Sequence, residues 1–315
     1  MQYVRQVGDY GIKSIIILKK REAFPVFIMF IIKILTSFFV ILILETFFSR
    51  EAWAWGPAIH TVISCSILDG ARQILPDIAY IIQNYSLEYI YGNLAADFFI
   101  GKGEKRKKGH SHNWETGFKI LGEAGSEREA SYAYGFLSHL AADVVAHNYF
   151  VPDFIYRFLM WKRISHLYTE AVADKFVGPF YLKLARDVLE MEQLECDKML
   201  KAAFIRNRHG LKAKRHIYTQ SVKVSDYLYC LPQLSFVYDY SPYKVSREYL
   251  IFMIGLSFRL VKDLLSYPDS SACLSHDPIG ADNLRLAGQK GMISKILNPD
   301  QTACRFPVDK ELLKL

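Results

Sequence analysis

One segment, YGFLSHLAADVVAHNYF at residues 134–150, constrains the fold most because it places a carboxylate inside an apolar stretch. Within it, His139, Asp143 and His147 follow the spacing H-x-x-x-D-x-x-x-H. Four residues advance about 400° on an α-helix, so these three side chains would share one helix face and span about 12 Å along it. Leucine, alanine and valine flank Asp143, and a carboxylate buried among them is costly unless it is paired or binds a cation. The segment therefore predicts a buried helix with a metal-binding face.

Further candidate ligands lie in four other segments, and six of the nine histidines fall between residues 60 and 166. They are His60 in WGPAIH, Asp97 in GNLAADFF, His110 and His112 in HSHNWE, and His166 with Glu170 in SHLYTE. Each has an ordinary alternative: H-x-x-x-E can be a simple helical pair, and an aspartate can cap a turn. Zinc, however, accepts imidazole and carboxylate together, and a carboxylate between two histidines can bridge two ions.

The rest of the chain indicates an all-α fold in a single domain, residues 55–315. Apolar residues recur at three- and four-residue spacing in Ala58–Ile67, Glu127–Asn148, Ile164–Val188 and Val245–Leu265, which predicts helices there. Alternating, strand-like runs are scarce. Apolar residues make up 51% and charged residues 23% of the chain, which provides a sizeable core and argues against disorder. The tyrosine-rich region Tyr218–Tyr243 has no clear assignment.

The first 54 residues have the pattern of a signal peptide. Phe24–Leu44 is almost continuously apolar, residues 34–44 carry no charge, and an A-x-A cleavage signal follows at residues 52–54. Cleavage after Ala54 would release a secreted chain that begins at Trp55. The alternative is a retained anchor, because the apolar stretch is long enough to span a bilayer marginally. The anchored protein would then face outward from the membrane.

Charge and cysteine content argue against a nucleic-acid partner and against a cysteine zinc site. The formal net charge is +7, of which residues 1–54, with seven Lys or Arg against four Asp or Glu, contribute a part. The remaining charge of about +4 is too mild to indicate a nucleic-acid partner, although it is compatible with an anionic lipid surface. Five cysteines without a C-x-x-C pair argue against a cysteine zinc site.

Taken in chain order, these pieces resemble the zinc-dependent phospholipase C family, to which the fungal single-strand zinc nucleases are related. The resemblance covers residues 55–170 and implies an all-α fold with three zinc ions. It implies one zinc held by Asp97, His112, His139 and Asp143, a second by Asp143, His60 and the α-amine and carbonyl of Trp55, and a third by His147, His166 and Glu170.

The resemblance also implies the chemistry: hydrolysis of a phospholipid phosphodiester at a membrane surface, releasing diacylglycerol and a phosphorylated headgroup. Asp97 would additionally be the catalytic general base, and we expect a monomer with no specific nucleic-acid partner. The sequence departs from the family in having three residues between Asp143 and His147, where the family often has five. The residues of the family's headgroup pocket also differ here. Ala58 stands where the family has an acidic residue and Gly109 where it has an aromatic one, and only the aromatic Phe98 is retained.

Two alternatives remain. One is a single-strand-specific nuclease with the same cluster, which is disfavoured because nucleases of this fold tend to carry aspartate at the position of Glu170. The other is a membrane-anchored zinc-binding protein that kept the fold and lost catalysis.

Overall fold

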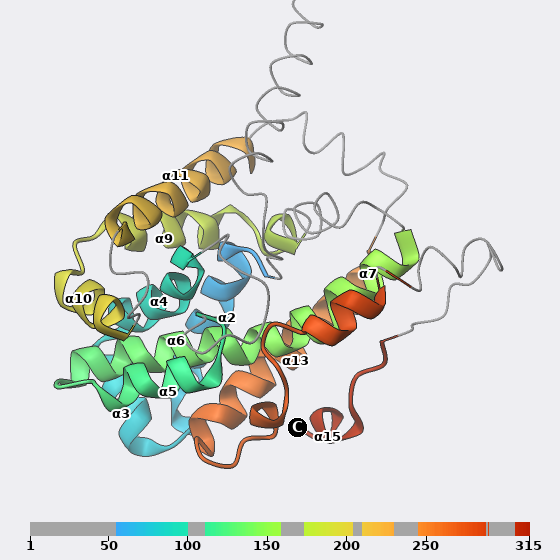
Figure 1. The fold of residues 1–315 in the computed structure, drawn as a ribbon, viewed down its shortest axis with the longest axis horizontal. Helices are drawn as coiled ribbons and strands as arrows, with labels where there is room; N and C mark the ends of the chain where they lie inside the picture. Colours follow the sequence, from blue (N-terminus) through green and yellow to red (C-terminus); the bar gives the residue numbers. More distant parts are fainter. Residues whose placement is uncertain are drawn as a thin grey trace, which may run out of the picture. The chain divides into compact units, whose positions relative to one another are not determined.

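The computed structural model describes residues 55–99, 111–158, 173–203, 210–229, 245–287, 289 and 306–315. All of these residues belong to one compact unit, Arg50–Leu315. The predicted signal peptide or anchor lies outside them. Every regular element in the described ranges is helical, so the predicted all-α fold is confirmed (Figure 1). Among these helices, none combines the length and apolarity that crossing a membrane requires.

The described helices follow one another along the chain without intervening strands. They are α2 (Pro57–Asp69), η1 (Ala71–Gln73), α3 (Pro76–Asn84), α4 (Ser86–Ala95), η2 (Ala96–Phe99), α5 (Trp114–Gly122), α6 (Glu127–Val145), η3 (Ala146–Phe150), α7 (Val151–Phe158), α9 (Pro179–Glu190), α10 (Leu194–Ala203), α11 (Leu211–Tyr229), α13 (Arg247–Ser266), η4 (Ala272–Ser275) and α15 (Lys310–Leu313).

Helix α6 forms the centre of the bundle, and α3, α4, α5 and α13 all pack against it (Figure 1). Its start is capped by Ser126, whose hydroxyl accepts the backbone N–H of Glu129 at 3.3 Å. Helix α4 approaches α6 so closely that a Cβ on Gly92 would lie 2.0 Å from the carbonyl oxygen of Tyr132. Likewise, a Cβ on Gly135 would lie 2.0 Å from the carbonyl oxygen of Tyr89. Glycines at this crossing therefore bring the α4 backbone, and the η2 turn that follows it, close to the face of α6.

Three of the four predicted helices are confirmed, as α2, as α6 continued by η3, and as α13. The fourth prediction, Ile164–Val188, was wrong as a continuous helix: its first part lies outside the described residues, and the described part is interrupted at Gly178. Gly178 has φ 96°, and Pro179 starts α9 with no N–H to continue the preceding turn. The unassigned tyrosine-rich region begins inside helix α11.

Candidate metal centre

The predicted metal-binding face lies on α6 and its continuation η3. His139, Asp143 and His147 are all buried. His139 Nε2 lies 3.1 Å and His147 Nε2 lies 3.5 Å from the same oxygen, Asp143 Oδ2. Element η3 is a π-helix, whose wider turns are rare and frequently occur at functional sites. The three side chains therefore converge as the H-x-x-x-D-x-x-x-H spacing predicts.

Two histidines from elsewhere in the chain complete the surroundings of Asp143. His60 on α2 places its Nε2 3.4 Å from Asp143 Oδ1. His112, which precedes α5, places its Nε2 3.3 Å from Asp143 Oδ2. The two carboxylate oxygens thus face different histidines, and this is the arrangement expected of a carboxylate that bridges two cations.

Asp97 joins the same cluster from η2. Its Oδ1 lies 3.3 Å from His112 Nε2 and 3.6 Å from His139 Nε2. The hydroxyl of Tyr218 on α11 donates to the other oxygen, Oδ2, at 3.5 Å. His112 Nε2 and His139 Nε2 are 3.0 Å apart. Two imidazole nitrogens on one tetrahedral zinc would be about 3.3 Å apart, so their spacing suits a shared ion.

Unsatisfied polar atoms test whether this cluster suits a metal. Both ring nitrogens of His60, Nδ1 of His139, Nδ1 of His147 and Oδ1 of Asp143 are buried without a hydrogen-bond partner among the described residues. Each such atom costs about 1–3 kcal/mol if it stays unpaired. Two groups of three residues each bring one ligand atom per residue within 4.8 Å of the others in the group. The groups are His60, Asp97 and His139, and His112, His139 and Asp143. The residues present therefore fit a zinc site.

The electrostatics keep both carboxylates ionised. Burial raises the pKa of Asp143, but the charge of His139 and hydrogen bonds from the surrounding histidines outweigh it, so its pKa lies well below the usual range. The pKa of Asp97 is lowered for the same reasons. Burial also lowers the pKa of His112, yet the hydrogen bonds that its ring donates to the Asp143 and Asp97 carboxylates raise this pKa to about 10. Burial lowers the pKa of His139. Metal binding would displace the proton from His112.

Trp55 lies against the helix that carries Asp143. It is buried, its indole Nε1 donates to the Ala142 carbonyl at 3.2 Å and to Ser257 Oγ at 3.0 Å, and its ring stacks on Phe150 with centroids 4.7 Å apart. The side chain thus anchors the start of the described chain one residue from Asp143 on α6. The role predicted for the α-amine and carbonyl of Trp55 as metal ligands stays a prediction.

The remaining predicted ligands, His166 and Glu170, lie outside the described residues, as does His110. Sequence reasoning missed one buried carboxylate nearby, Asp174. Its oxygens accept the backbone N–H groups of Ala58 and Ile59, at 3.2 and 3.1 Å, at the start of α2. Burial raises its pKa to about 7, although these two hydrogen bonds act in the opposite direction. The only sequence signal for Asp174 was its place four residues after Glu170.

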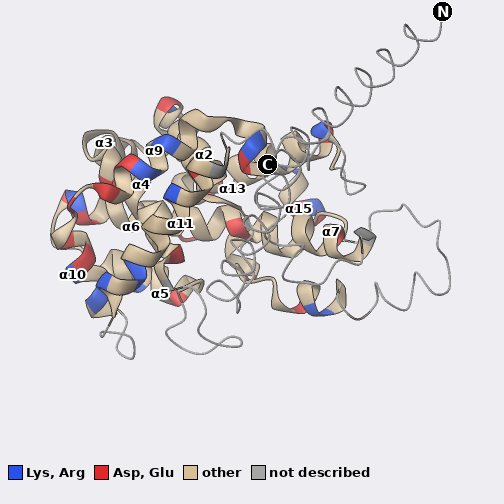
Figure 2. Ribbon diagram, turned by 90° about the horizontal axis from the view of Figure 1, so that it is seen from above, with Lys and Arg blue, Asp and Glu red and all other residues tan. Residues whose placement is uncertain are grey.

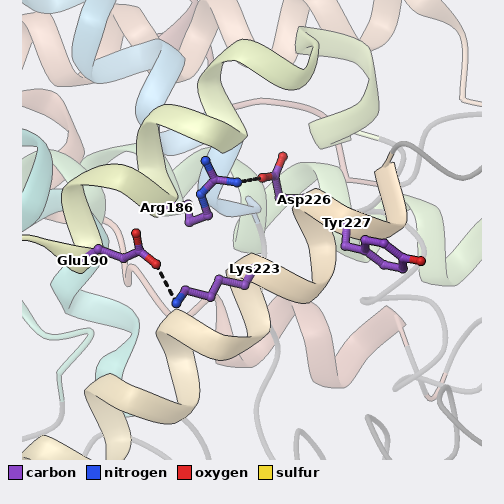
Figure 3. Close-up of a pocket in the computed structure, with 5 residues that line it drawn as sticks. All are labelled: Arg186, Glu190, Lys223, Asp226 and Tyr227. Carbon is purple, nitrogen blue, oxygen red and sulfur yellow. Dashed lines mark hydrogen bonds and ion pairs between the residues drawn. The ribbon is translucent and has the colours of Figure 1, made fainter.

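A hollow between α9 and α11 offers a different kind of site (Figure 3). Its cationic groups are already paired: Arg186 binds Asp226, and Lys223 Nζ lies 2.5 Å from Glu190 Oε1 (Figure 3). Because each cation there is neutralised by a carboxylate, the hollow is less suited to a phosphate than the histidine cluster is.

Comparison with known proteins identifies one family. Residues 59–217 match the family model described as zinc dependent phospholipase C. No curated protein and no solved structure gives a significant match. The matched range contains every predicted ligand except Trp55 and ends before α13. Because it covers half of the chain, the protein belongs to the zinc-dependent phospholipase C family.

Proposed function

We propose that this chain hydrolyses a phosphodiester with the help of zinc, acting as a phospholipase C that releases diacylglycerol and a phosphorylated headgroup. The observation that supports it most is the buried carboxylate of Asp143, with His60 facing one oxygen and His112 and His139 facing the other. On one side of this carboxylate, Asp143 Oδ1 and His60 Nε2 face each other and neither has a hydrogen-bond partner among the described residues, which suits a divalent cation between them.

The ligand assignment follows the resemblance described above. Asp97, His112, His139 and Asp143 would hold one zinc; Asp143 with His60 and the α-amine and carbonyl of Trp55 a second; and His147, His166 and Glu170 a third. Bound there, zinc would lower the pKa of a coordinated water toward about 7 and neutralise the phosphate oxygens.

The chain's own residues would orient the reactants and move the proton. Asp97 is ionised, and the Tyr218 hydroxyl holds its Oδ2, leaving Oδ1 turned toward the cluster. It is therefore placed to accept a proton from the attacking water. The buried surroundings of His60 and His139 restrict bulk water and strengthen the electrostatic interactions of the site.

The charge pattern of the described helices gives no support to a nucleic-acid substrate. Lys and Arg alternate with Asp and Glu over the described helices, which show no continuous basic stripe in this view (Figure 2). A nucleic-acid backbone would favour a continuous positive surface.

We also propose that the enzyme acts outside the cytoplasm, either secreted after cleavage at Ala54 or anchored and facing outward.

The test combines zinc analysis of the purified mature protein with a release assay on a panel of phospholipids and single-stranded DNA. We expect bound zinc and release of a phosphorylated headgroup from phospholipid, abolished by a chelator and restored by zinc. Cleavage of DNA without phospholipid turnover would favour the nuclease, and a zinc-loaded protein with neither activity would favour the non-catalytic alternative.

A further inference from the structure

A segment outside the family match packs onto the turn that carries His147. The match ends at residue 217, whereas the segment 277–283 follows η4, near the C-terminal end of the chain. Asn148, the neighbour of His147, donates its side-chain amide to the carbonyl of Asp277 at 2.8 Å. In return, the Asn283 side-chain amide donates to the Asn148 carbonyl at 2.9 Å. Two hydrogen bonds thus tie the π-helical turn to a distant part of the chain.

Gly280 contacts His147 itself. A Cβ on Gly280 would lie 2.2 Å from the carbonyl oxygen of His147 and 2.9 Å from its Cβ. Gly280 also has φ +60°, a left-handed conformation that other residues adopt at a cost. Both the contact and the conformation require glycine, so the backbone of segment 277–283 can press directly on the backbone of His147.

This contact matters because, among the described residues, His147 Nδ1 has no hydrogen-bond partner of the kind that usually supports a metal-binding histidine. Such a histidine normally donates its second ring nitrogen to a carboxylate or carbonyl, which fixes the ring. Nδ1 of His147 is buried and has no hydrogen-bond partner among the described residues, while Nε2 lies 3.5 Å from Asp143 Oδ2. The described structure therefore fixes the ring mainly by holding the backbone from which it projects.

We propose that Asp277, Gly280 and Asn283, which we call the His147 clamp, form a positioning element for the metal ion that His147 binds. The inference rests on the proposed zinc function. The clamp residues contact the backbone and Cβ of His147 and hydrogen-bond Asn148, and so hold the η3 turn with the imidazole in one orientation toward the cluster. Losing a group that hydrogen-bonds a metal ligand typically weakens metal affinity roughly 10- to 100-fold, and we expect a loss of the same order when the clamp is removed.

The test measures zinc per chain and the affinity of its weakest-bound ion, by elemental analysis and chelator competition on the full zinc-loaded chain. His147→Ala sets the reference and should lose one zinc equivalent. Gly280→Ala should weaken the same equivalent roughly 10- to 100-fold. Gly178→Ala is the matched control, because Gly178 also has a positive φ, +96°, but an added Cβ there meets nothing within 4 Å. The control should keep all its zinc.

Two further variants separate positioning from general destabilisation. Asn283→Asp keeps the size of the side chain but cannot donate to Asn148, so it should also weaken the binding of that zinc ion. If Gly280→Ala does not fold, this variant alone tests the clamp. The double variant Gly280→Ala/His147→Ala should lose no more zinc than His147→Ala alone. Melting of the zinc-free protein reports structural damage, which the Gly178 variant should share without losing metal.

The outcomes distinguish the two claims. If His147→Ala loses one zinc while folded Gly280→Ala and Asn283→Asp bind zinc as tightly as the unmodified chain, the clamp is overturned and the proposed function stands. If the unmodified chain binds no zinc that depends on His147, the ligand assignment fails and the clamp fails with it.

Discussion

Replacing Asp174 with asparagine should change how the stability of the protein depends on pH. The Asp174 carboxyl is buried at the start of α2, where it accepts the N–H groups of Ala58 and Ile59. Burial raises its pKa from 3.8 to about 7. Because the pKa is higher in the folded than in the unfolded state, the folded state binds more protons between these values. Stability from this group is therefore present below about pH 4 and is lost as pH rises through about 7.

The magnitude follows from the size of the pKa shift. About three pKa units at 1.36 kcal/mol each give about 4 kcal/mol, lost mostly between pH 4 and pH 7 and constant above. An asparagine at this position stays uncharged at every pH, although it can accept only one of the two N–H groups, which adds a difference that does not depend on pH. Relative to Asp174→Asn, the unmodified chain should thus lose about 4 kcal/mol of stability between pH 4 and pH 7.

The assay is urea denaturation of both zinc-free proteins from pH 4 to pH 8, with the difference in unfolding free energy plotted against pH. In this difference, the contributions of groups that titrate alike in the two proteins largely cancel. A flat difference, or an unmodified chain that gains stability with rising pH, would refute the reasoning and show that the two N–H bonds outweigh burial. Zinc near His60 should lower the pKa of Asp174, so the slope should shrink in the zinc-loaded pair.

Three other changes test the packing around the site and the role of the Trp55 α-amine. Trp55→Phe removes the indole bonds to Ala142 and Ser257 and should lower the unfolding free energy by about 1–3 kcal/mol, measured by denaturant titration. Extra residues before Trp55 should leave the cluster poorly loaded with zinc, and a protease cut immediately before Trp55 should restore loading; full loading of the extended chain would exclude the α-amine as a ligand. Gly92→Ala introduces a Cβ 2.0 Å from the Tyr132 carbonyl and should cost about 1–3 kcal/mol, again by denaturant titration, whereas Gly122→Ala, with nothing within 4 Å, should cost far less.

Much of the fold could be predicted from local sequence patterns. Helical periodicity located α2, α6 and α13, because their buried faces repeat every three or four residues. The break at Gly178 was missed because the periodicity continues on both sides of it. Only the Gly-Pro pair at residues 178–179 indicated that the helix stops.

The residues of the candidate site could be predicted from the sequence, but the contacts that hold them in place could not. The structure brings together the predicted residues His60, Asp97, His112, His139, Asp143 and His147. Their metal binding stays a prediction. The supporting contacts of Asp174 and Gly280 could not be predicted, because both reach partners more than 100 residues away. No local spacing encodes such a contact.

The most direct test of the central claim is the zinc content of Asp143→Asn. Asparagine keeps the size of the side chain and removes the charge that two cations would share. We predict that the purified variant loses at least one zinc equivalent per chain, measured by elemental analysis, and loses its activity. Asp197→Asn, which removes a carboxylate that pairs with Arg215 and belongs to neither ligand set, should keep its zinc. An Asp143→Asn protein with all its zinc and full turnover would contradict the assignment of Asp143 as the bridging ligand.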